Sequence, residues 1–258
     1  MPHYFAGFSG GRKALIPGVA GFETIQRNHR LTLAPERGIH PAVAPCSLSE
    51  NPVHLDMLEA AAMVAPDFCL NTLLDTRGRM LGAVAGHWVR AHEVGCREAQ
   101  RFRLVVDEPV DLLITSSGGL PHDCNFMQSI KAVLNLQSIV RPGGFVLWIA
   151  QAAGGMHPGF LEWAAIRDDA ELDRAVREDY SLTGHNAIML RRLSRNAQVS
   201  LVSDLPRDEV ERIGFRAVDS VQDELDSICA ELHAGFRVAV APTANVICAA
   251  VEPRARVQ

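Results

Sequence analysis

The stretch MPHYFAGFSGGRKALIPG, residues 1–18, combines residue types that could do chemistry. His3 precedes a glycine-rich run that leads to Lys13, and His29 follows further along the chain. Such a lysine could anchor a phosphate, form a Schiff base or attach a cofactor covalently. A neutral histidine could act as a general base or a metal ligand. The plainer alternative is a solvated lysine between surface histidines, because GxxGGRK is not a Walker A loop.

A second candidate site lies in TSSGGLPHDCNFMQSIK, residues 115–131. The pattern predicts a strand that ends in a glycine turn and a helix that begins after it. Ligands of open α/β sheets bind at such strand ends, beside helix N-termini. Gln128 and Lys131 are three residues apart and therefore share a helix face. An amide and a cation placed together could hold a small carboxylate or hydroxy acid.

The other notable histidines favour plainer roles. His54 follows a proline at a predicted helix start, where capping or packing is expected. His87 and His92 are five residues apart, which is not the i, i+4 spacing of a helical metal pair, so structural or surface roles are favoured. His122 lies in the glycine turn, where a polar contact to a substrate is the alternative to a surface position.

The segments that must position these residues differ between the two parts of the chain. Residues 1–45 are rich in glycine, proline and histidine and have little hydrophobic periodicity. Up to residue 103 we expect a helix at 24–31, a helix at 52–64 capped by Ser49, strands at 67–75 and 80–86, and a helix at 87–103.

After about residue 100, strands and helices alternate. A buried-type strand at 109–119, a helical pattern over 123–140 and a second strand after 141 form a βαβ unit, which predicts parallel strands with a right-handed crossover. Further helices are expected near 161–179, 186–195, 206–213 and 219–233, with strands near 198–202 and 236–241. The second part therefore reads as a parallel α/β domain.

Composition excludes several classes of protein. The net charge of −5 and the pI near 6.1 give no support for a nucleic-acid or membrane-surface partner. No apolar run reaches the roughly 18 residues that would span a bilayer, and no secretory signal is present. The six cysteines are scattered without a CxxC pair, so we expect reduced thiols and a cytoplasmic protein.

Taken together, HYFAGFSGGRKALIPGVAGFETIQRNH, NPVHLDMLEAA, GHWVRAHEVGC and GGLPHDCNFMQSIKAV resemble the nickel-pincer lactate racemases and related 2-hydroxy-acid racemases and epimerases. The resemblance implies a nickel-pincer nucleotide, nickel pyridinium-3,5-bisthiocarboxylic acid mononucleotide, bound covalently by Lys13. His29 would be the protein ligand to nickel, and His3 one of two acid/base histidines. Gln128 and Lys131 match the pair that contacts the substrate.

The implied reaction is a racemisation or epimerisation of a small 2-hydroxy acid. A histidine removes the hydroxyl proton while hydride leaves the α carbon for the cofactor, and the planar 2-keto acid then receives hydride on either face. Two bases are required because the two enantiomers present their hydroxyl groups from different directions.

The family carries roughly as much chain again before the matching segment. That part would supply the second acid/base histidine, a substrate-binding arginine and much of the nucleotide-phosphate site. We therefore expect an α/β protein with a partial cofactor-binding catalytic domain at 1–97, a hinge at 98–108 and an α/β domain at 109–258. The alternatives are a truncated coding sequence, half of a split enzyme with a separately encoded N-terminal half, and an inactive remnant that acts only as a binding or assembly partner. A partial domain should expose apolar surface, and this chain alone should be poorly soluble or inactive.

Overall fold

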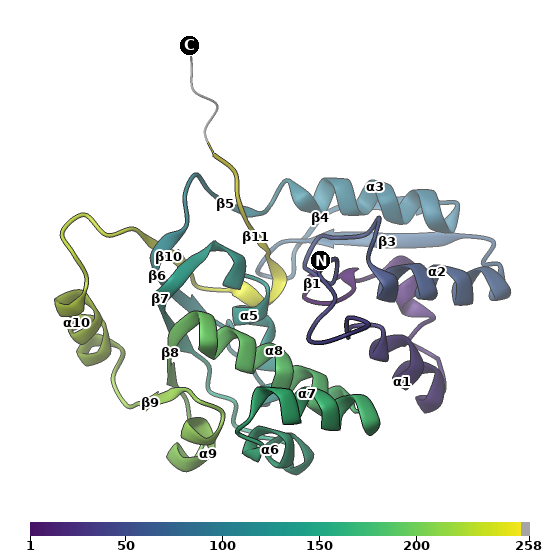
Figure 1. Cartoon of the computed structure of the whole chain (residues 1–258). Coiled ribbons are helices and arrows are strands. Elements are labelled where there is room, and N and C mark those ends of the chain that lie inside the picture. The colour runs from purple at the N-terminus through teal and green to yellow at the C-terminus, as the bar shows by residue number, and fades with distance from the viewer. Residues whose placement is uncertain (254–258) are drawn as a thin grey trace. The chain divides into compact units, whose positions relative to one another are not determined.

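The computed structural model describes residues 1–253 of the chain (Figure 1). Its contacts divide it into two compact units. Unit 1 comprises residues 1–103, 175–185 and 246–248, and unit 2 comprises 104–174, 186–245 and the segment that begins at Ala249. Each unit is thus assembled from distant parts of the sequence. The finer division into a catalytic domain, a hinge and a C-terminal domain remains a prediction.

Unit 1 begins with short elements and continues with longer helices and a hairpin. Its elements are β1 (Pro2–His3), β2 (Gly7–Phe8), the 3-10 helix η1 (Gly11–Ala14), α1 (Phe22–Arg30), α2 (Pro52–Val64), β3 (Cys69–Leu74), β4 (Met80–Gly86) and α3 (Trp88–Gln100). Helix α2 has the predicted bounds, but its cap is Asn51 rather than Ser49. The Asn51 side chain accepts hydrogen bonds from the backbone N–H groups of Val53 and His54, at 3.1 and 3.4 Å.

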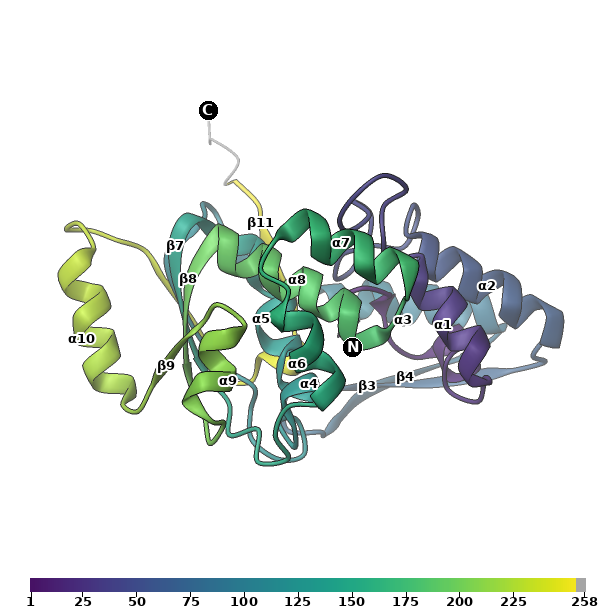
Figure 2. The same cartoon turned by 60° about the horizontal axis from the view of Figure 1, so that its bottom comes forward.

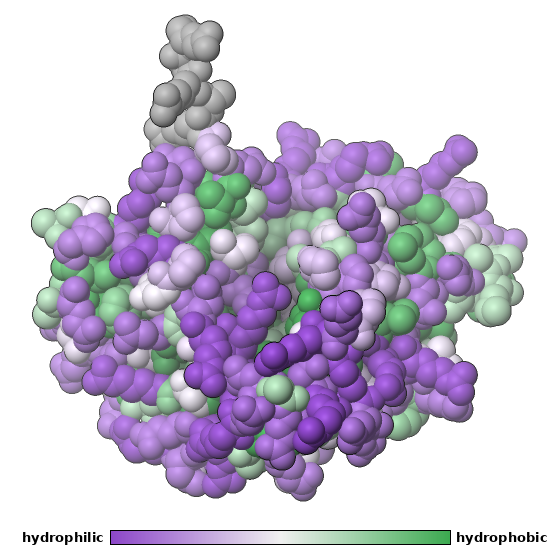
Figure 3. Space-filling view, in the orientation of Figure 1, coloured by the Kyte–Doolittle hydropathy of each residue, from purple (hydrophilic) through white to green (hydrophobic). Residues whose placement is uncertain are grey.

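The β3–β4 hairpin is covered on one face only. The strands are antiparallel, and α3 packs against both of them. Residues of the opposite face are exposed, including Leu70 (65%) and Met80 (67%). Hydrophobic atoms also reach the surface where α2 leads into β3 (Figure 3), at Met63, Val64 and Phe68. Apolar side chains of both the hairpin and the end of α2 are therefore exposed in unit 1.

Two cysteines depart from the expectation of reduced thiols. Cys46 and Cys248 form a disulfide within unit 1, although 202 positions separate them in the sequence. Cys69, Cys96, Cys124 and Cys229 are free thiols. Spacing along the chain could not reveal this pair, because the fold alone brings the two residues together.

Unit 2 is built on a five-stranded sheet. Its strands run in the order β10-β6-β7-β8-β9, and all neighbouring pairs are parallel. The bounds are β6 (Val110–Ser116), β7 (Val140–Ile149), β8 (Ala197–Val202), β9 (Arg216–Val218) and β10 (Val238–Ala241). A separate parallel pair joins β5 (Leu104–Val106) to β11 (Ala249–Val251). The predicted α/β class and parallel sheet are confirmed.

Helices cover both faces of this sheet (Figure 2). The helices of unit 2 include α4 (Phe126–Ser129), α5 (Lys131–Leu134), α6 (Pro158–Ala165), α9 (Arg207–Arg212) and α10 (Val221–Glu231), with the 3-10 helices η2 (Gln137–Ile139) and η3 (Ala244–Val246). Helix α10 packs one face, where Ile228 meets Leu112, Phe145 and Leu147. On the other face Trp148 packs against Phe126 of α4. The alternation of Leu147 and Trp148 follows from the two-residue period of a strand.

Two predicted helices are interrupted. The pattern over 123–140 forms α4, α5 and η2 instead of one helix, and the hydroxyl of Ser129 donates to the carbonyl of Asn125 at 2.9 Å, a local bond that competes with helix geometry. The pattern over 161–179 forms α6 and α7 (Asp169–Glu178), with the chain extended at Ile166. Hydrophobic spacing alone did not show either break.

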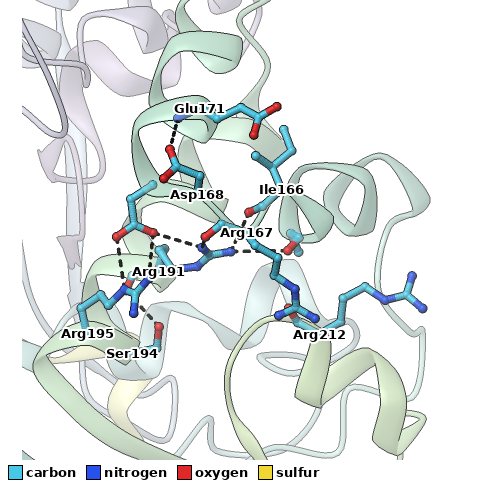
Figure 4. A network of polar contacts seen from close by, with 10 residues as sticks. Ile166, Arg167, Asp168, Glu171, Arg191, Ser194, Arg195 and Arg212 are labelled. Atoms are coloured by element: carbon cyan, nitrogen blue, oxygen red, sulfur yellow. Dashed lines mark hydrogen bonds and ion pairs between the residues drawn. The ribbon is translucent and has the colours of Figure 1, made fainter.

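The break between α6 and α7 is held by an arginine from α8 (Leu182–Asn196). Figure 4 shows Arg191 reaching into the turn. Its guanidinium donates to the carbonyls of Arg167 at 2.8 Å and Ile166 at 3.0 Å, and to Asp169 Oδ1 at 3.1 Å. Arginine can satisfy helix C-terminal carbonyls and a carboxylate at once, because its donors are fixed in a planar fork.

Within residues 1–253, none of the helices is both long and apolar enough to cross a bilayer.

Candidate functional site

The glycine-rich loop of unit 1 is organised around Arg12. This side chain is 1% exposed, and its guanidinium donates to the carbonyls of Ala6 at 2.7 Å and Phe8 at 2.9 Å. It also donates to Nε2 of His92, on α3, at 2.9 Å. Burial lowers the pKa of Arg12 to about 10, so the group remains charged at neutral pH. Arg12 therefore ties the loop that carries His3 and Lys13 to α3.

Two glycines let this loop pack tightly. Gly7 has φ +74° and Gly11 has φ +53°, conformations that residues with a side chain rarely adopt. A Cβ on Gly7 would lie 2.0 Å from the carbonyl oxygen of Ser47, and one on Gly11 would lie 2.6 Å from the His92 ring. The glycines of the opening segment thus serve close packing of the backbone.

Three of the predicted site residues gather around Phe5. The ring of His3 lies 4.4 Å from the Phe5 ring, centroid to centroid, and the ring of His29 lies 4.7 Å from it. The Nζ atom of Lys13 is 5.9 Å from the Phe5 centroid, a cation–π distance. The chain thus places an amine and two imidazoles about one buried aromatic ring.

His29 is poised as a neutral imidazole. Its side chain is 4% exposed, and burial, followed by the charge of Lys13, lowers its pKa to about 4. Its Nδ1 atom lies 3.0 Å from Oδ1 of Asn28. A neutral imidazole can donate a lone pair to a metal, whereas a protonated one cannot.

Other histidines of unit 1 have structural surroundings. His87 caps α3 by accepting from the N–H of Val89 at 3.3 Å, which confirms a structural role. His54 is buried and its ring lies 6.4 Å from that of His92. Burial lowers the pKa of His54 to about 3 and of His92 to about 4, in both cases with a contribution from the charge of Arg12. Burial also raises the pKa of Cys96, beside His92, to about 11.

In unit 2, Gln128 and Lys131 lie where the strand order reverses. The chain proceeds from β6 through β7, β8 and β9, and then returns to place β10 on the other side of β6. The carboxyl ends of β6 and β10 therefore flank a topological switch point, the usual ligand position in such sheets. Gln128 follows β6 and accepts a hydrogen bond from Nζ of Lys131. Burial lowers the pKa of Lys131 below its ordinary value.

Asn245 joins the loops at this switch point. It lies in the connection after β10, and its Nδ2 atom donates to the carbonyls of His122 at 2.7 Å and Gln128 at 3.2 Å. The indole N–H of Trp148 donates to the hydroxyl of Ser117 at 3.0 Å, in the turn that follows β6. Hydrogen bonds from the segment after β10 and from Trp148 of β7 therefore hold the loop after β6 and the start of α4, which carries Gln128.

The side chains around Phe5 could serve a metal that a cofactor holds. Among residues 1–253 no group of three or more histidine, cysteine, aspartate or glutamate side chains could hold a metal ion. His29 could offer a metal one imidazole nitrogen, and the other donors would come from a bound cofactor or from water. An amine close to the same aromatic ring, that of Lys13, is suited to holding such a cofactor. The residues present thus fit a pincer-type nucleotide.

The sequence reasoning missed Arg12 and Asn28. Arg12 stands beside Lys13 in the quoted motif, and Asn28 stands beside His29. No pattern marks either as buried, because their partners are reached only through the fold: His92 is 80 positions from Arg12, and Asp56 is 28 positions from Asn28. Their adjacency to candidate residues was the only available signal.

Comparison with known proteins gives the relationships of the chain. The sequence profiles described as lactate racemase N-terminal domain and lactate racemase C-terminal domain match residues 1–39 and 105–248. The lactate racemase of Thermoanaerobacterium thermosaccharolyticum is 34% identical over 210 residues, which are 79% of this chain and 48% of that protein. The lactate racemase of Lactiplantibacillus plantarum is 30% identical over 247 residues, 93% of this chain and 57% of that protein.

Solved structures give the same relationship as the sequence comparisons. The lactate racemase apoprotein from T. thermosaccharolyticum matches with a TM-score of 0.86 at 28% identity, over 96% of this chain and 60% of that one. A Thermotoga maritima protein, with a TM-score of 0.69 at 15% identity over 98% of this chain and 65% of that one, shares the fold. The chain thus spans about half the length of the curated relatives that it matches. Matches at both ends of the sequence and across the fold show that this chain belongs to the lactate racemase family.

Proposed function

We propose that this chain carries the cofactor-anchoring part and the C-terminal domain of a 2-hydroxy-acid racemase or epimerase that uses a nickel-pincer nucleotide. The observation that carries the proposal is the meeting of Lys13 and His29 at Phe5, in a member of the lactate racemase family. Lys13 would hold the nucleotide covalently, and Nε2 of His29 would be the protein ligand to nickel. The bound nucleotide would supply the hydride acceptor. Side chains of the protein would bind the substrate and transfer its hydroxyl proton.

His3 is the proposed acid/base group. Its Nδ1 atom faces the backbone N–H of Ala6 at 3.4 Å, so in the neutral ring the proton is held on Nε2. Taking the hydroxyl proton at Nε2 therefore requires the ring to give up the Ala6 contact and to carry its own proton on Nδ1. The imidazolium that forms can then return a proton from Nε2 to the oxygen of the 2-keto acid.

Lys131 and Gln128 are the proposed carboxylate-binding pair. The cation would neutralise the carboxylate while the α carbon inverts, and the amide would bind the same group or the hydroxyl. The hydrogen bond between the two side chains sets their orientation before a substrate arrives. Their place at the topological switch point supports this role.

The proposed site also includes the portion of the lactate racemases that this chain does not match, with the second acid/base histidine expected from the family. That portion would belong either to the same polypeptide or to a separately encoded half. The exposed apolar face of the β3–β4 hairpin is a surface that such a portion could cover. The alternative is an inactive fragment that acts only as a binding or assembly partner.

The test is expression of the chain in cells that make the nickel cofactor. Intact-mass spectrometry should show an adduct on Lys13, metal analysis should show about one nickel per chain, and both should be absent in cells without the cofactor pathway. Unmodified Lys13 and nickel-free protein in cofactor-making cells would contradict the proposal. Adduct and nickel without lactate racemisation would support a chain that loads the cofactor but needs the unmatched portion of the family for turnover. Racemisation by the chain alone would show that this portion is not needed.

A further inference from the structure

Both polar atoms of the Asn28 side chain have hydrogen-bond partners, one of which is His29. Its side chain is 1% exposed and comes from the last turns of α1. The amide nitrogen, Nδ2, donates to the carbonyl of Val53 at 3.1 Å and to Oδ2 of Asp56 at 2.8 Å, both at the start of α2. The amide oxygen, Oδ1, lies 3.0 Å from Nδ1 of His29.

These partners fix the direction of the amide. A backbone carbonyl and a carboxylate oxygen accept hydrogen bonds, so both must face the nitrogen of Asn28 rather than its oxygen. The oxygen is then turned toward His29. Because that oxygen can only accept, Nδ1 of His29 must donate, and in a neutral imidazole the lone pair then lies on Nε2.

We propose that Asn28, oriented by Asp56, is a positioning residue that holds His29 in its Nδ1–H tautomer. The functional meaning rests on the proposed role of His29 as a nickel ligand: the tautomer leaves the Nε2 lone pair ready to bind. Metal-binding histidines generally donate their other ring N–H to an acceptor that fixes both tautomer and ring direction. Here the carboxylate of Asp56 acts through the amide of Asn28, so a residue of α2 sets the tautomer of His29 on α1.

The tautomer can be measured without metal or cofactor. The full 258-residue chain, labelled with 15N-histidine, is studied by two-bond 1H–15N correlation NMR at neutral pH, and the His29 signals are assigned with His29→Gln. The expected result is a protonated Nδ1 and an unprotonated Nε2. A His29 ring protonated at Nε2 in the wild-type chain would by itself overturn the proposal, without any variant.

Variants separate positioning from simple packing. Asn28→Leu removes the acceptor at similar volume and should move His29 to the Nε2–H form. The paired exchange of Asn28→Asp with Asp56→Asn keeps an acceptor oxygen beside Nδ1 of His29 and a donor between the two positions, and should restore the Nδ1–H form. Asp56→Leu should reduce the Nδ1–H fraction, whereas the exposed acid one turn further along α2 provides the matched control Glu59→Gln, which should leave it unchanged. An unchanged tautomer in both Asn28→Leu and Asp56→Leu would overturn the proposal.

Nickel loading gives a second readout in cofactor-making cells. Asn28→Leu should weaken metal affinity by about 10- to 100-fold, the usual effect of losing such a partner, and the paired exchange of Asn28→Asp with Asp56→Asn should recover it. The two proposals fail differently. An Nδ1–H ring in a chain that never loads nickel would overturn the proposed function and support the assignment of Asn28, whereas a loaded chain with an Nε2–H ring would overturn only the latter.

Discussion

Lys13 and His29 meet at the ring of Phe5, one through its ammonium group and the other through its imidazole. Burial, followed by the charge of Lys13, lowers the pKa of His29. An anchoring amine and a neutral metal-binding nitrogen are thereby brought into one neighbourhood by a loop and a single helix.

Lys13→Arg should show whether Lys13 anchors the cofactor or only contributes a positive charge. The guanidinium keeps a cation in the neighbourhood of Phe5 but cannot form the expected covalent link to the cofactor. We expect the intact-mass adduct to disappear and the nickel content to fall at least about tenfold, since tethering raises the effective concentration of the nucleotide. Arg27→Lys, at an exposed position on α1, is the control and should load normally. Adduct and nickel at wild-type levels in Lys13→Arg would exclude Lys13 as the anchor.

Arg12→Met should destabilise unit 1 by about 3 kcal/mol. The substitution keeps an apolar stem but leaves buried carbonyls of Ala6 and Phe8, and the ring of His92, without their donor. The measurement is the free energy of unfolding in urea. Arg27→Met removes an exposed pair with Glu23 and should change the free energy by less than about 0.5 kcal/mol. Equal effects of the two substitutions would contradict the role of Arg12.

His54→Leu should make the chain less sensitive to acid. The folded state lowers the pKa of His54 from 6.5 to about 3, so below pH 6.5 the unfolded chain binds the proton first. Stability from this group is complete above pH 6.5 and is lost as pH falls toward 3. Urea titrations at pH 7 and pH 4 should show that the variant loses on the order of 3 kcal/mol less than the wild type. A wild-type pH response in His54→Leu would refute the prediction.

Arg191→Met should weaken unit 2 by about 2–4 kcal/mol. It removes the donor that serves the carbonyls of Ile166 and Arg167 and the carboxylate of Asp169, and 11% of the Arg191 side chain is exposed. Arg195 contacts the same carboxylate from a side chain that is 66% exposed, which makes Arg195→Met the matched control. Chemical unfolding followed by Trp fluorescence should show a loss below about 1 kcal/mol for that control. A similar loss of unfolding free energy in both variants would contradict a contribution from the Arg191 hydrogen bonds to the carbonyls of Ile166 and Arg167.

Much of the fold could be predicted from local patterns. The strands β3, β4, β6 and β8 and the helix α2 follow from the hydrophobic period, which a short window of sequence contains, although the cap of α2 is Asn51 and not the predicted Ser49. The strand β9 was missed because three residues, Arg216–Val218, are too few to show alternation. The break at Ile166 was missed because the partner that stabilises it, Arg191, lies 25 positions away.

The site could be predicted only in part. His3, Lys13 and His29 were found through the family resemblance, and the fold brings them to one ring; their chemical roles stay proposals. Asn28 could not be found, since what distinguishes it is the direction of its amide. That direction is set by Asp56 and Val53 on another helix, and residue type alone carries no such information.

The strand order of unit 2 also has a consequence for synthesis on the ribosome. Strands β6 to β9 can assemble in the order in which they emerge, but β10 pairs with β6 across more than a hundred intervening residues. Until residue 241 has left the exit tunnel, one side of β6 stays open and can attract another nascent chain. Because Asn245 follows β10, the brace on the turn of Gln128 forms last, so the proposed carboxylate-binding pair matures only when translation of the unit is almost finished.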